Sequence, residues 1–174
     1  MASPLYQLSA FKAGFALAQL LPRPVLHRIA DGIGLWGLRR SEEFRRTLGG
    51  NLAVATGRSG DALDALVEEN TQCFARMLAD YFRFTGPRVV EAGRLVDGWD
   101  GWEHITAARE RGRGTIIVTG HLGHWELGGL VLAMRSLPMT VVTLPEPTPG
   151  LMRWREACRR QLGIQTIEIG RAHV

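Results

Sequence analysis

The run Thr115-Ile-Ile-Val-Thr119, bounded by Gly114 and Gly120, is the sequence feature that most restricts the fold. An unbroken stretch of β-branched residues favours a strand, and the lack of polar alternation is typical of a strand buried on both faces in a parallel sheet. A second apolar run, Met139–Leu144, follows Pro138, and residues 124–135 between the runs have a helical pattern. This order of strand, helix and strand predicts a right-handed βαβ unit.

The rest of the chain adds a mainly helical section before this unit and one further helix and strand after it. The helix is predicted at residues 151–162, and the third strand is predicted to begin at 164–167. The expected fold class is therefore α/β, in which a leading helical section is followed by a βαβ-type, partly parallel sheet. The leading section contains four segments of helical or apolar pattern, at 5–21, 25–38, 61–84 and 102–111.

The longest expected helix, 61–84, has apolar residues at steps of three and four, from Leu63 to Phe82. This spacing places them on one face, so we expect a packing role. Ser59 is the candidate N-cap, and the Gly86-Pro87 pair is expected to end the helix. A short acidic and aromatic connection, containing Trp99 and Trp102, is expected to follow.

The loop after the first predicted strand reads Gly120-His-Leu-Gly-His-Trp-Glu126. Active sites of open α/β sheets gather beyond the carboxyl ends of the strands, so His121 is expected at a crevice. Glu126, in the first helical turn, is placed to accept a hydrogen bond from one nitrogen of His121, which would raise the basicity of the other. The pair is thus a candidate general base for deprotonating a hydroxyl group, without a Ser or Cys nucleophile.

Three other interpretations of this loop stay open on the residues alone. In the first, His121 and His124 with Glu126 bind a metal, although the spacing differs from H-E-x-x-H and no third ligand is evident. His124 is also a candidate helix-terminus residue with a structural role. The glycines would suit a phosphate at a helix N-terminus, although the Walker pattern and its Lys are missing.

The N-terminal segment combines apolar sequence with a following basic cluster. Residues 5–21 are mostly apolar and stop at Pro22, and the apolar segment 25–38 leads into a basic cluster: Arg39, Arg40, Arg45 and Arg46. This order predicts a segment in the membrane interface, and the alternative is a core helix followed by a solvated basic face. Neither an uninterrupted apolar span nor a signal-peptide cleavage pattern is present.

Composition sets wider limits. The 174 residues carry a net charge of +4 and a hydrophobic fraction of 45%, which exclude a disordered or collagen-like chain. Lys12 is the single lysine among 21 basic residues, a bias that fits either a GC-rich coding sequence or a surface for phosphate and anionic lipid. With two cysteines, Cys73 and Cys158, neither a disulfide scaffold nor a zinc ribbon is expected, and the chain is interpreted as one from a reducing compartment.

Residues 112–129, GRGTIIVTGHLGHWELGG, closely resemble the first motif of the bacterial lipid A biosynthesis acyltransferase family. The resemblance extends over about 10–167. It includes the basic lead-in at Arg45 and Arg46 with Asn51-Leu52, and the segment from Arg159 to Gly163. His124 departs from the pattern, because many relatives carry Asn there.

The resemblance implies a glycerolipid acyltransferase-like fold with an incomplete sheet, and a role for each site residue. His121 would take the proton of an acceptor hydroxyl, Glu126 would orient it, and Arg159, Arg160 and His124 would bind substrate. The donor would be a thioester of acyl carrier protein or coenzyme A, and the acceptor a lipid A precursor-like glycolipid or a lysophospholipid. No cofactor, metal or nucleic-acid partner is implied. The implied location is the cytoplasmic side of the cell inner membrane, as a peripheral or monotopic protein.

We accordingly divide the chain into a membrane-associating segment, 1–40, and the N-terminal part of an acyltransferase domain, 41–167. Residues 168–174 do not resemble the family and match a translated sequencing-adapter read-through, so they are expected to be artefactual. The chain would then hold about half of a larger domain, with little activity alone and an exposed strand edge. The competing functions are a non-catalytic membrane-associated α/β protein or inactive fragment, and a metal-dependent hydrolase.

Overall fold

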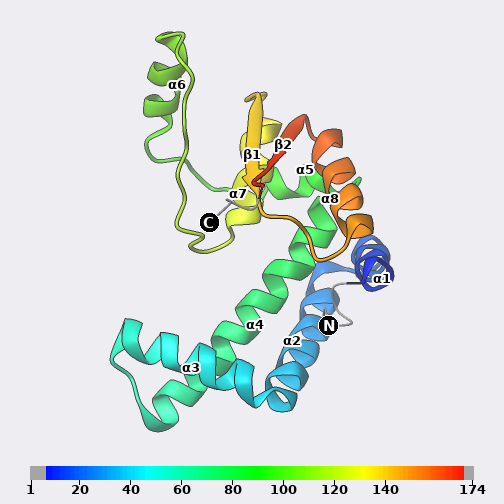
Figure 1. The fold of residues 1–174 in the computed structure, drawn as a ribbon, viewed down its shortest axis with the longest axis vertical. Helices are drawn as coiled ribbons and strands as arrows, with labels where there is room; N and C mark the ends of the chain where they lie inside the picture. Colours follow the sequence, from blue (N-terminus) through cyan, green and yellow to red (C-terminus); the bar gives the residue numbers. More distant parts are fainter. Residues whose placement is uncertain (1–6, 171–174) are drawn as a thin grey trace.

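The computed structural model describes residues 7–170, which form helices and a small parallel sheet (Figure 1). In chain order the elements are α1 (Leu8–Leu20), α2 (Arg23–Arg40), α3 (Glu42–Thr56), α4 (Gly60–Phe84), α5 (Val89–Gly93), α6 (Trp102–Glu110), α7 (Trp125–Met134), β1 (Met139–Thr143), α8 (Pro149–Gln161) and β2 (Ile164–Glu168).

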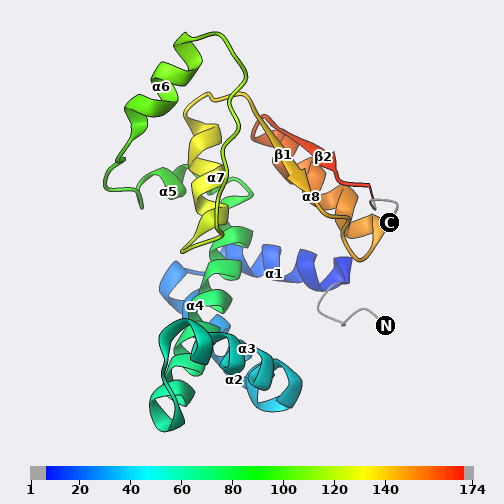
Figure 2. The ribbon, with the colours of Figure 1, turned by 60° about the vertical axis from the view of Figure 1, so that its left-hand side comes forward.

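Helix α4 is the element against which the rest of the helical section packs. Helix α2 lies along it, α3 packs on the same two helices, and α1 crosses near its C-terminal end (Figures 1 and 2). One core cluster joins α1, α2 and α4 through Ala18, Leu26 and Ala79. Small side chains in this cluster let the backbones approach closely. The predicted apolar face of 61–84 is therefore confirmed as a packing face at this end.

Aromatic side chains hold α1 between α4 and α8. Phe11 contacts the Phe82 ring edge-on at 5.2 Å between centroids, and Trp154 contacts both Phe11 and Phe15. Just after α4, Gly86 lies against the Phe15 ring, where an added Cβ would come within 2.7 Å of it. The glycine expected to end the long helix therefore also makes room for α1.

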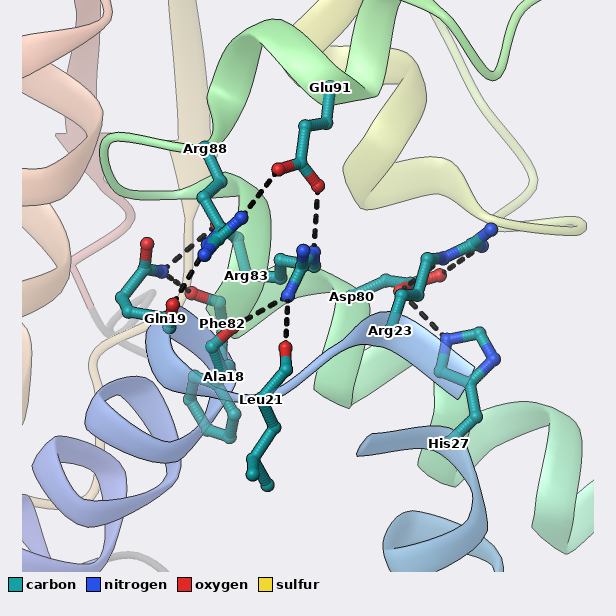
Figure 3. A network of polar contacts seen from close by, with 10 residues as sticks. All are labelled: Ala18, Gln19, Leu21, Arg23, His27, Asp80, Phe82, Arg83, Arg88 and Glu91. Carbon is teal, nitrogen blue, oxygen red and sulfur yellow. Dashed lines mark hydrogen bonds and ion pairs between the residues drawn. The ribbon is translucent and has the colours of Figure 1, made fainter. Parts of the chain in front are cut away.

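A polar network fixes the C-terminal end of α1 on α4 and α5 (Figure 3). Arg83 is buried on α4, and its Nη1 donates to the carbonyls of Ala18 and Leu21 at 3.0 and 2.7 Å. Its Nε donates to Glu91, which also accepts from Arg88. These bonds satisfy carbonyls that the end of a helix leaves without partners, so the buried cation secures the turn between α1 and α2.

The sheet consists of β1 and β2, which pair in parallel from Met139 with Ile164 to Thr143 with Glu168. Helix α8 connects them and packs against β2, so that β1, α8 and β2 form a parallel βαβ unit beside α1 (Figure 2). The βαβ unit predicted from 115–119, 124–135 and 139–144 is not formed, because 115–119 is not a strand. The predicted strands at 139–144 and 164–167 and the helix at 151–162 are confirmed with small shifts of their ends.

The prediction of a strand at 115–119 is wrong for this structure. The segment is irregular, and Ile116 and Val118 expose 90% and 88% of their surface. A β-branched run is apolar enough for a strand, but a strand also needs a hydrogen-bonded neighbour, and the described residues pair none with it. The strand at 139–144 is not buried on both faces either, because its residues alternate in exposure.

Three smaller features also differ from the sequence analysis. Residues 42–56, assigned there only as a basic lead-in, form the helix α3, which begins with a Ser41 hydroxyl that accepts from the Phe44 amide at 3.2 Å. The short helix α5 lies in the expected connection. Ser59 does occupy the N-cap of α4, but its side chain makes no capping hydrogen bond.

The suspected tail, 168–174, begins within the paired part of β2, and the Ile169 amide donates to the carbonyl of Thr143 at 2.8 Å. Residues 171–174 lie outside the described part of the chain, and so do residues 1–6 of the predicted membrane segment. Among the described helices, none combines the length and the apolar character that crossing a membrane requires.

Candidate functional site

His121 lies in the irregular connection between α6 and α7. Its φ angle is +53°, in the left-handed region that a non-glycine residue seldom adopts. The side chain is exposed, and its ring lies 5.1 Å from that of Trp125, centroid to centroid. The backbone N–H donates to the Thr119 hydroxyl at 3.3 Å. The candidate base is therefore held by a local turn and one aromatic neighbour, and its ring is open to a substrate.

His124 is the N-cap of α7, where its Nδ1 accepts a hydrogen bond from the Leu127 amide at 3.1 Å. This confirms the interpretation of His124 as a helix-terminus residue. Its Nε2 is buried without a hydrogen-bond partner in the described part of the chain, 3.8 Å from a carboxylate oxygen of Asp80. Burial lowers the pKa of His124, and the nearby Asp80 only partly offsets this. The neutral imidazole is the form that caps the helix, because Nδ1 must be unprotonated to accept.

Asp80, on α4, is buried and shared by side chains from α2. Arg23 donates to both of its oxygens, at 2.9 and 2.7 Å, and His27 Nε2 lies 2.8 Å from Oδ1 (Figure 3). Burial alone would raise the pKa of Asp80, but the hydrogen bonds from Arg23 and His27 outweigh it and hold the pKa below its ordinary value. The carboxylate therefore stays charged beside the N-terminus of α7.

Glu126 lies in the first turn of α7, as predicted, and its partner is Arg155 of α8. Arg155 Nη2 donates to Glu126 Oε1 at 3.3 Å. The same guanidinium donates to Glu146 at 2.6 Å and to the Tyr81 hydroxyl at 3.2 Å. Burial would lower the pKa of Arg155, but Tyr81, Glu146 and Glu126 raise it above its ordinary value. Three other segments of the chain thus bind the half-buried guanidinium of Arg155.

The structure brings some of the predicted site residues together and leaves others apart. His121 and Glu126 follow one another in the same loop and turn, but no hydrogen bond joins them among the described residues, and Glu126 is bound to Arg155 instead. Arg159 and Arg160 form the last turn of α8. Arg159 is half-buried with an unpaired Nη1 within residues 7–170, and Arg160 is exposed beside a hollow lined by Glu156 and Thr166.

Sequence analysis missed Arg155, Glu146 and Tyr81. One signal for Glu146 was its place just after the carboxyl end of the second predicted strand, where polar site residues collect. Arg155 precedes Arg159 by one helical turn, but the two could not be distinguished by spacing alone. Over residues 7–170, no group of three or more His, Cys, Asp or Glu side chains is arranged to hold a metal ion.

The fold and the site together define a class: a mainly helical protein with a small parallel βαβ unit, in which Arg155 of α8 binds Glu126 in the first turn of α7, just after the His121 loop. The profile of the bacterial lipid A biosynthesis acyltransferases matches residues 4–170, and the chain belongs to this family.

Among curated proteins, the phosphatidylinositol mannoside acyltransferase of Mycolicibacterium smegmatis is 25% identical in an alignment over 162 residues, and the alignment covers 91% of this chain. The match covers 52% of that relative, so the chain spans about half the length of the curated relative that it matches. No solved structure matches the chain significantly.

Proposed function

We propose that this chain contributes to an O-acyltransferase that moves a fatty acyl group from a thioester to a hydroxyl of a membrane glycolipid or lysophospholipid. The observation that carries the proposal is the placement of His121 and Glu126 at the start of α7. His121 is exposed, and Glu126 is held by the half-buried cation of Arg155. Membership of the acyltransferase family supports the reaction class.

In the proposed reaction, His121 accepts the proton of the acceptor hydroxyl as the oxygen attacks the thioester carbonyl carbon. The tetrahedral intermediate expels the thiolate, which takes the proton from the His121 imidazolium. The ester product forms without an acyl-enzyme. Glu126 orients the imidazole and stabilises its charged form. Because the two side chains are not bonded here, this step requires the 119–123 loop to bring His121 onto Glu126, a tightening that is common on substrate binding.

Arg159 and Arg160 are proposed to contact phosphate, either on the donor's phosphopantetheine or on the acceptor. Arg159 supports this with its unpaired, buried Nη1, and Arg160 with its exposure at the end of α8. A guanidinium that lacks a protein partner is suited to bind a phosphate oxygen. The Nδ1 of His124, in contrast, already accepts the capping hydrogen bond from Leu127. Only its Nε2 is left for a substrate.

Helix α2 is proposed as the surface that meets the membrane, on the cytoplasmic side of the inner membrane, in a peripheral or monotopic manner. Exposed apolar side chains at i, i+4, i+8 and i+11 follow one face of the helix: Val25, Ile29, Ile33 and Trp36. Exposed arginines flank this face at positions 28, 39 and 40, and the Arg40 guanidinium lies 5.0 Å over the Trp36 ring. An apolar stripe between arginines is typical of interfacial helices that bind anionic lipid.

We expect Trp36→Glu to lower the affinity for anionic vesicles, measured by co-sedimentation, by about tenfold, because a charged side chain replaces an apolar one at the lipid boundary. The matched control is Val54→Glu, which changes another exposed apolar residue on α3. Equal vesicle binding by the two variants would contradict the assignment of this surface to α2.

The reaction itself is tested with the protein produced from the complete gene, mixed with acyl carrier protein or coenzyme A thioesters and vesicles that contain a lipid A precursor or a lysophospholipid. We expect release of thiol that depends on acceptor, with an acylated lipid identified by mass spectrometry and no effect of chelators. Membrane binding without transfer from either donor would favour the non-catalytic alternative. Acceptor-independent hydrolysis that chelators abolish would favour a metal-dependent hydrolase.

A further inference from the structure

Outside the predicted pair of His121 and Glu126, the guanidinium of Arg155 forms hydrogen bonds to three different segments of the chain. Each of its three nitrogens binds a different partner. Nη2 donates to Glu126 of α7, Nη1 to Glu146 after β1, and Nε to the hydroxyl of Tyr81 on α4. Its Cζ also lies 5.1 Å over the Tyr81 ring. The planar fork of Arg allows this use of all three nitrogens at once, and a Lys ammonium cannot reproduce it.

Burial makes these contacts strong. The exposed fraction of the side chain is 18% for Arg155, 11% for Glu146 and 26% for Glu126. Charge-assisted hydrogen bonds with little solvent around them are stronger than those at a surface. Without the cation, two carboxylates would face each other in a half-buried space, so Arg155 both joins and neutralises them.

Arg155 links helices α7 and α8, which pack against different elements. Helix α7 packs on α4 and α5, whereas α8 packs on β2 and α1. Arg155 spans from α8 to the first turn of α7, which follows the His121 loop. The bond therefore fixes Glu126 relative to the carboxyl end of β1.

We infer that Arg155 is a positioning residue for acyl transfer, which holds Glu126 so that its second carboxylate oxygen faces the approaching His121. This inference rests on the proposed function. Glu126 uses Oε1 for Arg155, and no hydrogen bond to its Oε2 is formed within the described residues. That oxygen is the one left to receive an imidazole N–H. Arg155 acts through Glu126 and touches no reacting atom.

The test compares Arg155→Met with Arg153→Met in the protein from the complete gene. Arg153 is an exposed residue on the same helix, so its replacement controls for the loss of one positive charge. We expect Arg155→Met to lower kcat by about 10- to 100-fold with the donor KM little changed, because displacement of a catalytic group affects the chemical step. Arg155→Lys keeps the charge without the fork and is expected to recover part of the loss.

A second readout needs no substrate. Burial raises the pKa of the Tyr81 hydroxyl and Arg155 lowers it, so Arg155→Met is expected to raise it further than in the otherwise identical wild-type protein. Tyrosinate absorbance after a rapid pH jump measures this before alkaline unfolding, and Arg153→Met is expected to leave it unchanged.

The outcomes separate the inference from the proposed function. Wild-type transfer with kcat of Arg155→Met within twofold of wild type would overturn the inference, and so would a rise in donor KM alone. An unshifted Tyr81 titration would show that the contact is not made in solution, which also overturns it. If Arg155→Met shifts the Tyr81 titration but the wild-type protein transfers no acyl group, the proposed function is overturned. If Arg155→Met does not fold, Arg155→Lys is held to the same kcat and KM criteria.

Discussion

Two adjacent residues of α4, Asp80 and Tyr81, contact residues of the candidate site. Asp80 lies beside His124, the cap of α7, and Tyr81 accepts a bond from Arg155, which holds Glu126. A helix interpreted from sequence as scaffold thus also places polar groups at the site. A 3.6-residue period identifies which face is buried, but it does not distinguish an apolar contact from a buried carboxylate that finds its partners on another helix.

Replacing His124 tests the α7 cap. We expect His124→Ala to lower the free energy of unfolding by about 1 kcal/mol near neutral pH, the usual effect of losing an N-cap acceptor. His124→Asn should stay close to wild type there, because Asn is a good N-cap. Urea denaturation monitored by circular dichroism measures both, and an unchanged His124→Ala would contradict the cap.

The pH dependence has a defined sign. Burial lowers the pKa of His124 in the folded state, so below about pH 6.5, the ordinary histidine pKa, the unfolded state takes up the proton first. The contribution of His124 is therefore complete above that pH and is lost as the pH falls toward its lowered folded pKa. The difference in unfolding free energy between wild type and His124→Asn, measured as a function of pH, isolates this contribution of His124.

At the level of elements, the turn between α1 and α2 depends on Arg83. We expect Arg83→Met to lower the free energy of unfolding by about 3 kcal/mol, because it leaves two carbonyls of the α1–α2 turn, those of Ala18 and Leu21, without a donor. The control is Arg76→Met, which breaks an exposed ion pair with Asp31 and should change stability little. Similar losses in both variants would contradict a special role for the buried cation.

Elements with a strong internal pattern could be predicted, and those that depend on distant partners could not. The helix at 61–84 and the strands at 139–144 and 164–167 formed close to their predicted bounds. The run at 115–119 has the same composition as a strand but no paired neighbour among the described residues. The same holds for the site. The loop and the helix start were predictable for His121, His124 and Glu126, whereas two of the three Arg155 partners, Glu126 and Tyr81, lie 29 and 74 residues away.

At the scale of the described molecule, residues 7–170, part of the exposed apolar surface lies in the loop before α7 and just after β1. Ile116, Val118 and Leu122 are exposed before α7, and so is Leu144 after β1. Patches of this kind bind other apolar surfaces. The described sheet has two strands, and its edges are further sites for association.

We therefore expect the 174-residue chain to bind an apolar fluorescent dye and to self-associate at micromolar concentration. The double variant Ile116→Thr/Val118→Thr should reduce both effects, whereas Val54→Thr, an equally exposed change on α3, should not. Sedimentation velocity with dye titration measures this. A monomer that binds no dye would contradict an uncovered apolar surface.

We propose that His121 is the general base of an acyl transfer and that Glu126 supports it. The most direct measurement is single-turnover acyl transfer by the protein from the complete gene, in wild type, His121→Ala, Glu126→Gln and the double variant. We predict that His121→Ala lowers the rate by about 100- to 10,000-fold and Glu126→Gln by less. The double variant should be no slower than His121→Ala, since the two residues act as a unit. Transfer by a folded His121→Ala at the wild-type rate would contradict the account.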